Sequence, residues 1–164
     1  MKEQEFFPTV WDNLVKIITS AVLILLISLT ILFTFIPDIP TILRIGIIIL
    51  YVAILLVPLL WAPRGYFLQN NLIIVKRIIG DLEIIVSKKP KIWKWTWWGG
   101  RLWASGGLYG YFGIFVFKRI GTVRMYATNR NNLVLVEDIN NTKYLVSPEN
   151  VDRFMDLLNR SLVA

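Results

Sequence analysis

The sequence predicts an α+β membrane protein, with an N-terminal hairpin of two transmembrane helices followed by a small antiparallel β domain that a C-terminal helix closes. Three observations predict this architecture. Residues 17–36 and 45–62 are uncharged apolar runs, residues 65–146 alternate between short apolar runs and turn residues, and residues 147–162 carry one apolar stripe at helical spacing. With 164 residues, the chain has room for one small domain beside the hairpin.

The two apolar runs have the length and composition of membrane spans. At about 1.5 Å rise per residue, each is about as long as a hydrocarbon core is thick. Residues 37–44 connect them and hold Pro37 and Pro40, so the helices should be antiparallel neighbours. A signal peptide core is usually only about 7–15 residues long, and a soluble bundle of this size could not cover helices that are apolar all round. We therefore expect residues 1–64 to be a membrane anchor and residues 65–164 a separate domain.

Basic residues near the ends of the two runs predict the side of the membrane on which the domain lies. Lys2 and Lys16 precede the first run and Arg64 follows the second, whereas the connector holds Arg44 alone. By the positive-inside rule, both the N- and the C-terminus should be cytoplasmic, with the hairpin in the cell membrane.

The positive charge of the chain is concentrated after the anchor. Residues 1–63 hold three Lys or Arg and four Asp or Glu, whereas residues 64–164 hold fifteen and seven. A basic domain beside a membrane is attracted to anionic lipids, which we therefore expect among its partners. Nucleic acid is the rival explanation for a basic domain, but the membrane tether disfavours it, and we expect no nucleic-acid partner.

Short apolar runs rich in β-branched and aromatic residues predict about seven antiparallel strands after the anchor. Turn residues separate them, including asparagine-containing clusters at 129–132 and 138–141, which favour tight hairpins. We expect consecutive strands to pair as a meander that forms a barrel or sandwich. The expected strands are residues 66–68, 72–75, 82–86, 113–118, 122–128, 133–137 and 143–146.

A helix should close the domain at its C-terminal end. Ser147 is a good N-cap, and Pro148 suits the first helical position. Apolar residues from Val151 to Leu162 recur at helical spacing and form one stripe. We expect this stripe to cap an open sheet or one end of a barrel.

A segment rich in lysine and tryptophan, residues 87–103, is the candidate site of membrane or partner contact. Tryptophan suits the headgroup level of a bilayer or the centre of a protein interface, and neighbouring lysines add attraction to anionic lipid. The same tryptophans could instead fill the core, so three interpretations stay open. Glycines between residues 99 and 113 argue against a regular strand over much of this span. The candidate contact residues are Lys88, Lys89, Lys91, Trp93, Lys94, Trp95, Trp97, Trp98, Arg101 and Trp103.

The composition excludes the commonest catalytic and metal-binding chemistry. The chain has no cysteine and no histidine, which rules out thiolate metal sites, cysteine nucleophiles and Ser–His–Asp triads. Asp81 and Glu83 lie two positions apart, and we interpret them as turn and surface charges rather than as a catalytic dyad. We expect no enzymatic activity, no cofactor and no metal site.

Several short motifs resemble those of the prokaryotic pleckstrin-homology-like (PH-like) domain family. They are residues 110–113, residues 125–129, and residues 144–150 followed by Phe154 and Leu158. The resemblance covers roughly residues 65–162, and members of that family often follow one or two transmembrane helices. It implies a PH-like fold and a binding or assembly module without a catalytic centre. Because PH-like domains bind lipid headgroups, peptides or other subunits through different faces, the resemblance does not assign a ligand.

Two functional hypotheses follow from the sequence. The first is a membrane-anchored accessory or scaffold protein that docks onto, or helps assemble, a larger complex of membrane protein subunits. The alternative is a lipid-responsive module that recognises anionic headgroups at the inner leaflet through residues 88–94 and the neighbouring tryptophans.

Overall fold

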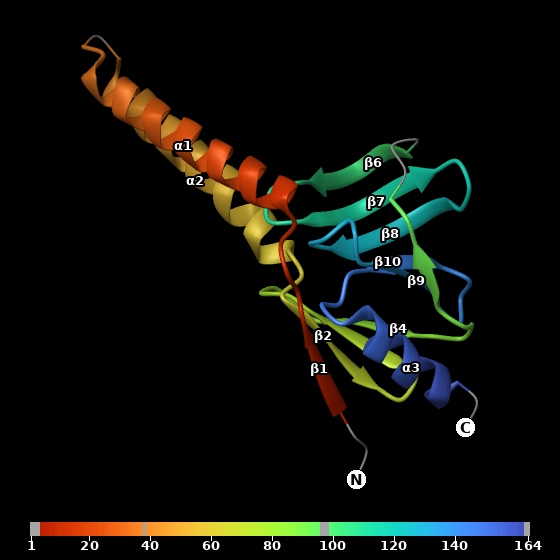
Figure 1. Ribbon diagram of the computed structural model, residues 1–164. Coiled ribbons are helices and arrows are strands. Elements are labelled where there is room, and N and C mark those ends of the chain that lie inside the picture. The colour runs from red at the N-terminus through yellow and green to blue at the C-terminus, as the bar shows by residue number, and fades with distance from the viewer. Residues whose placement is uncertain (1–3, 38, 96–98, 163–164) are drawn as a thin grey trace.

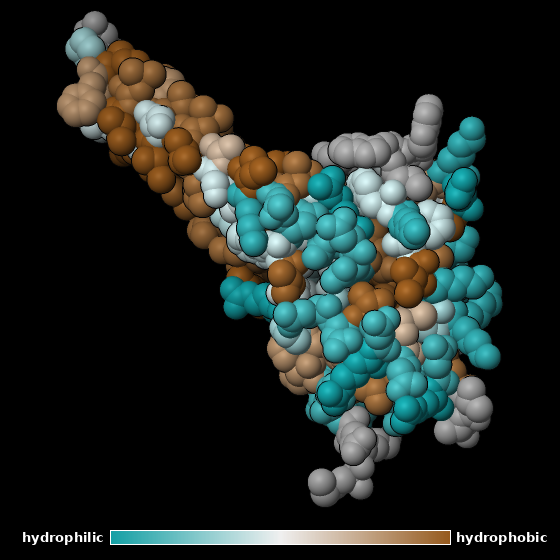
Figure 2. All heavy atoms as spheres, viewed as in Figure 1, coloured by the Kyte–Doolittle hydropathy of each residue, from teal (hydrophilic) through white to brown (hydrophobic). Residues whose placement is uncertain are grey.

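Two long helices project from a β-rich domain in the computed structural model, which describes residues 4–37, 39–95 and 99–162 (Figure 1). Helices α1 (Asn13–Phe35) and α2 (Thr41–Trp61) are 23 and 21 residues long, and by length and composition both are candidate membrane-spanning helices. Few of their side chains are buried, and Figure 2 shows the pair as an apolar arm that leaves a more polar domain. The two predicted helices are therefore confirmed.

Helix α1 begins four residues before the apolar run because Asp12 caps it. The Asp12 carboxylate accepts a hydrogen bond from the backbone N–H of Val15, at 2.8 Å. The capped turn adds Lys16 to the helix, just before the uncharged stretch.

The helical hairpin is an insertion between two paired strands of the domain. β1 (Gln4–Pro8) precedes α1 and β2 (Gly65–Gln69) follows α2, and the two strands pair antiparallel with Pro8 opposite Gly65. Phe7 of β1 is only 3% exposed, and its ring meets that of Phe154 edge to face at 5.1 Å. The sequence did not predict β1, because five residues that end in proline are too short to show a reliable period. The structure thus joins a segment expected in the anchor to the first sheet.

The strands form two sheets. The first has the order β1–β2–β3–β4, with antiparallel neighbours, and Asn70 takes a left-handed conformation in the turn between β2 and β3. The second has the order β5–β9–β10–β8–β7–β6. Within the described residues nine strands follow the helices, against about seven predicted, and the α+β fold class is confirmed. The remaining strands are β3 (Leu72–Lys76), β4 (Leu82–Ile85), β5 (Lys91–Trp93), β6 (Gly99–Gly106), β7 (Tyr111–Phe117), β8 (Gly121–Ala127), β9 (Leu133–Glu137) and β10 (Lys143–Val146).

The order of the second sheet corrects the predicted meander. β10 lies between β8 and β9 and runs parallel to β8, so residues 129–132 connect two strands that are not neighbours. The hairpin predicted there is wrong, whereas the one at residues 138–141 is confirmed, with Asn141 in a left-handed conformation. This arrangement places Leu145 of β10 between Met125 and Leu135, where its side chain is fully buried.

The glycine-rich span forms a longer strand than its composition predicted. β6 is eight residues long and pairs with β7, with a bulge between Arg101 and Trp103. Gly113 of β7 has a φ of 116°, and a Cβ atom there would collide with the carbonyl oxygen of Trp103. Glycine therefore permits the close approach of the two strands here rather than preventing regular pairing.

Helix α3 (Val151–Ser161) closes the domain, but its N-cap differs from the predicted one. Asn150 is the N-cap, and its side chain accepts a hydrogen bond from the Arg153 N–H at 3.0 Å. Ser147 is buried outside the helix, where its hydroxyl accepts a hydrogen bond from the Thr128 N–H at 2.8 Å. The predicted apolar stripe is confirmed, because Phe154 and Leu158 are buried against the first sheet. Burying one such side chain stabilises the fold by about 1.5–3 kcal/mol.

The two faces of the second sheet carry two separate cores. One face packs β9 and β10 against the first sheet and α3, with Tyr66, Val136 and Phe154 at its centre. The opposite face packs Phe117 and other side chains around Val15 of α1. The base of α1 is therefore part of the domain core.

Candidate functional site

The base of α1 is joined to the domain through a buried carboxylate. Asp12 accepts hydrogen bonds from the Tyr111 hydroxyl at 3.2 Å and from the Arg130 side chain at 3.0 Å, as well as from Val15. Burial acts to raise the pKa of Asp12, but hydrogen bonds from Val15 and Arg130 and the guanidinium charge outweigh it and lower the pKa below its ordinary value. Asp12 therefore stays ionised, and it links the start of α1 to the start of β7 and to the loop that follows β8.

A second contact holds α1 about two turns beyond Asp12. The hydroxyl of Thr19 donates a hydrogen bond to the Gly107 carbonyl at 3.4 Å and accepts one from the Tyr109 N–H at 3.1 Å. Gly107 has a φ of 122°, and a Cβ atom there would collide with Ile18. The loop between β6 and β7 therefore packs directly on the first turns of α1.

The end of α2 is fixed by the loop between β3 and β4. The Ile79 N–H donates a hydrogen bond to the Leu60 carbonyl at 3.1 Å. The Arg77 guanidinium lies 5.6 Å from the ring centres of both Trp61 and Tyr126, within the range of cation–π contacts. We call the contacts of Asp12, Thr19 and α2's end the helix–domain joint.

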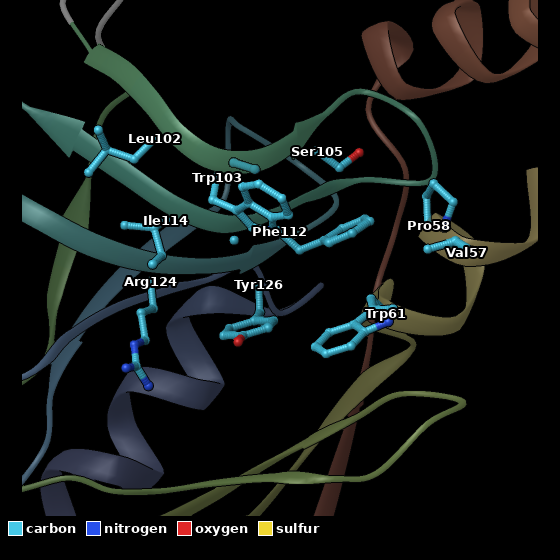
Figure 3. Close-up of a pocket in the computed structure, with 12 residues that line it drawn as sticks. Val57, Pro58, Trp61, Leu102, Trp103, Ser105, Phe112, Ile114, Arg124 and Tyr126 are labelled. Atoms are coloured by element: carbon cyan, nitrogen blue, oxygen red, sulfur yellow. The ribbon is translucent and has the colours of Figure 1, made fainter. Parts of the chain in front are cut away.

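A groove of about 830 Å³ lies where α2 enters the domain. One face of the second sheet contacts the first sheet through β9 and β10. The groove lies on the same face, beyond this contact, over strands β6, β7 and β8. Figure 3 shows the rings of Trp61, Trp103, Phe112 and Tyr126 around one space. The residues that line the groove are Val57, Pro58, Trp61, Leu102, Trp103, Ala104, Ser105, Phe112, Gly113, Ile114, Arg124 and Tyr126.

The two ends of the groove differ in polarity. Val57 and Pro58 of α2 form an apolar end, and Arg124 of β8 lies at the opposite end (Figure 3). Among the described residues, no lining side chain is acidic, and no carboxylate forms an ion pair with Arg124. The Arg77 guanidinium adds a second positive charge beside Trp61 and Tyr126 in the wall. The groove is thus amphipathic and electropositive.

The structure divides the lysine and tryptophan segment between the two edges of the second sheet. β5 is one edge strand and β6 is the other. Lys88 forms an ion pair with Glu137 at 2.6 Å, while Lys89, Lys91 and Lys94 are exposed. The four lysines and Trp103 are therefore not brought together.

The tryptophans of this segment differ in their surroundings. Trp93 and Trp95 are half-buried, and their rings lie 6.4 Å and 5.6 Å from that of Phe117, so these two fill the core. Trp103 is 84% exposed and forms a wall of the groove. Trp97 and Trp98 lie outside the described residues, and for Arg101 only the backbone, in β6, is described.

Sequence reasoning missed Arg124, Tyr126 and Arg77. A signal for the first two was present in β8, where Thr122, Arg124 and Tyr126 alternate with three buried residues. Such alternation indicates that one face of the strand is not part of an apolar core. Arg77 carried no comparable signal, because its partners come from distant parts of the chain.

Comparison with known proteins gives one match. The family model described as "Bacterial PH domain" matches residues 64–162, which include every described strand after the helices and the whole of the C-terminal helix α3. No curated protein and no solved structure matches the chain.

Proposed function

This chain belongs to the bacterial PH domain family, and from that premise we propose that it is a membrane-anchored accessory or scaffold protein. In this proposal α1 and α2 span the cell membrane, and the PH domain docks onto a larger membrane protein complex or helps to assemble one. Strand β1, which precedes α1, and the domain that follows α2 lie at the same end of the hairpin (Figure 1). Lys16 and Arg64 flank the two apolar runs at that end and only Arg44 lies at the other, which favours the cytoplasmic side for the domain.

The observation that carries this proposal is the helix–domain joint. A flexible tether would let the domain rotate freely, whereas Asp12, Thr19 and the Leu60–Ile79 contact hold both helices against the sheets. The domain is therefore held at one height and one angle relative to the hairpin. A fixed orientation lowers the entropic cost of docking onto a partner embedded in the same membrane.

Exposed apolar side chains on the domain supply a surface for such a partner. Leu102 and Trp103 of the edge strand β6 are 68% and 84% exposed. Large exposed apolar side chains at a sheet edge are typical of contact sites rather than of an inert surface.

Native sizing of the full chain, extracted from its own membranes in a mild detergent, tests the proposal. We expect a complex with co-purifying membrane subunits in constant ratio, and a photo-crosslinking residue at position 102 should join the chain to one of them. The same residue at exposed position 152 of α3 is the matched control and should give little cross-linking. A monodisperse monomer without co-purifying subunits would contradict the proposal.

The alternative drawn from the sequence, headgroup recognition through residues 88–94, has less support. β5, which contains Lys91, is at the sheet edge opposite β6, whereas the β6–β7 loop packs on α1. In Figure 1 the green segment that precedes the grey trace lies on the side of the domain away from the helices. These lysines therefore lie at the sheet edge opposite the one whose loop contacts α1.

A further inference from the structure

We infer that the groove between the end of α2 and strands β6–β8 binds one anionic phospholipid by its headgroup and the adjoining part of its chains. The inference rests on the membrane placement in the proposed function, and it adds a ligand and a site to that function. Four features carry it: the position of the groove, its polarity, its walls and its charge.

The groove opens at the level where α2 leaves the proposed bilayer. Val57, which is 54% exposed, and Pro58 belong both to the apolar surface of α2 and to the groove lining. Trp61 follows one turn later, where interfacial tryptophans are commonly found. A lipid in the same leaflet can therefore enter the groove sideways while its chains stay against α2.

The polarity of the groove matches the orientation of a lipid in that leaflet. Its apolar end, at Val57 and Pro58, faces the proposed membrane, and its charged end, at Arg124, lies farther into the domain (Figure 3). A phospholipid in the leaflet points its chains toward the first end and its phosphate toward the second. A ligand of the opposite polarity would place a charged group against α2.

The walls and the volume fit the glycerol and upper chain region. Trp103, Phe112 and Tyr126 present aromatic side chains to the groove, which are suited to the boundary between headgroups and chains. A volume of about 830 Å³ is within the range that small-molecule sites occupy. Trp103 is 84% exposed without a ligand, and a bound lipid would cover it.

The charge of the groove selects an anionic headgroup. Arg124 is an exposed guanidinium that forms no ion pair with a carboxylate in the described part of the chain. Arg77 is held in place by Trp61 and Tyr126 and by a hydrogen bond from its Nε to the Gly80 carbonyl at 2.9 Å. Guanidinium groups bind phosphate oxygens through charge-assisted hydrogen bonds, which Arg124 can form as a lining residue, and Arg77 adds positive potential from beside the wall.

Native mass spectrometry of the purified full chain in a neutral detergent tests the inference. Phosphatidylglycerol and phosphatidylcholine with the same acyl chains are titrated separately. We expect one phosphatidylglycerol molecule to stay bound per chain at concentrations where phosphatidylcholine does not. Arg124→Gln should weaken this binding about tenfold, as expected for the loss of one charge-assisted contact. Arg119→Gln, which removes the same charge from the exposed turn between β7 and β8, is the matched control and should leave it unchanged.

Trp103→Gln provides a second test that does not depend on charge. The side chain is largely exposed, so the variant should fold, and it should weaken lipid binding several-fold by removing one wall. Equal retention of the two lipids, or equal weakening by Arg124→Gln and Arg119→Gln, would overturn the inference. Carbonate extraction of membranes separates this failure from failure of the anchor, because a chain that stays in the membrane without selective lipid binding refutes the groove alone.

Discussion

Asp12 and Tyr111 are separated by 99 positions in the sequence, yet the Tyr111 hydroxyl lies 3.2 Å from an Asp12 carboxylate oxygen. Asp12 caps the N-terminus of α1, and Tyr111 is the first residue of β7. One carboxylate therefore serves both as a helix cap and as a tie between the hairpin and the PH domain.

Substitution at Asp12 should separate the two roles. Asp12→Asn keeps a good N-cap but loses the charged pair with Arg130, whereas Asp12→Ala loses both. We expect the alanine variant to lose about 2–4 kcal/mol of unfolding free energy and the asparagine variant clearly less. Chemical denaturation in detergent measures both. Asp156→Ala is the control. It removes the exposed ion pair between Asp156 and Arg160 on α3 and should lower the unfolding free energy by less than about 0.5 kcal/mol. Equal losses in the two Asp12 variants would refute a capping role.

The lowered pKa of Asp12 predicts a specific acid sensitivity. Because the folded pKa lies below the ordinary 3.8, the carboxylate contributes stability above that value and loses it as the pH falls toward the folded pKa. The stability difference between the wild type and Asp12→Asn should therefore be constant near neutral pH and shrink below about pH 4. Denaturation curves between pH 3 and 7 provide the measurement, and a difference that stays constant over this range would contradict the prediction.

Tyr66 predicts an alkaline sensitivity of the opposite sign. Its buried hydroxyl donates a hydrogen bond to the Tyr126 carbonyl at 2.6 Å and accepts one from the Ser147 N–H at 3.0 Å. Burial raises the pKa of Tyr66 to about 12, so the folded state resists ionisation and loses stability as the pH rises from 10 through that value. Tyr66→Phe should lack this loss. At neutral pH the variant should cost about 1–3 kcal/mol, because two buried backbone groups lose their partner. Unfolding monitored by circular dichroism tests both expectations, and an unchanged alkaline transition would argue against the first.

Local patterns predicted most elements of this fold but few of its long-range pairings. Continuous apolar runs located both helices, and β-branched runs located the described strands after them except β5 and β6, because these signals lie within one segment. The position of β10 between β8 and β9 depends on contacts between segments, which no local period records. The same limit applies to Ser147. Its residue type predicts a helix N-cap, but in the structure its hydroxyl accepts a hydrogen bond from the Thr128 N–H.

The sequence did not predict which tryptophans of the lysine and tryptophan segment are buried. It left membrane contact, partner contact and core filling open for all of them, whereas in the structure Trp103 is exposed and Trp93 and Trp95 pack on Phe117 of the core. Alternation within an extended chain predicts which side chains share a face, and it cannot tell which face another sheet will cover. Arg124 was missed for the same reason, because only the tertiary arrangement leaves its face of β8 open.

The insertion of the hairpin between β1 and β2 predicts that a water-soluble PH domain needs its first strand. A chain that starts at residue 64 lacks Phe7, which packs on Phe154, and it exposes the edge of β2. Because Pro8 pairs with Gly65, an inserted two-residue Asn-Gly turn can join them and replace residues 9–64. We expect the joined chain to be more stable than the truncated one by about 3–5 kcal/mol, which is the cost of losing a buried phenylalanine.

Guanidinium denaturation of both soluble chains, with analytical ultracentrifugation to detect association, measures this difference. Phe7→Ala in the joined chain is the control, because it keeps the strand's backbone pairing while removing the ring that contacts Phe154. This variant should lose most of the stability that the truncated chain loses, but it should stay monomeric, since β1 still covers the β2 edge. Coincident unfolding curves for the joined and truncated chains would show that β1 is dispensable, and the hairpin could then be regarded as a simple N-terminal extension of an independent domain.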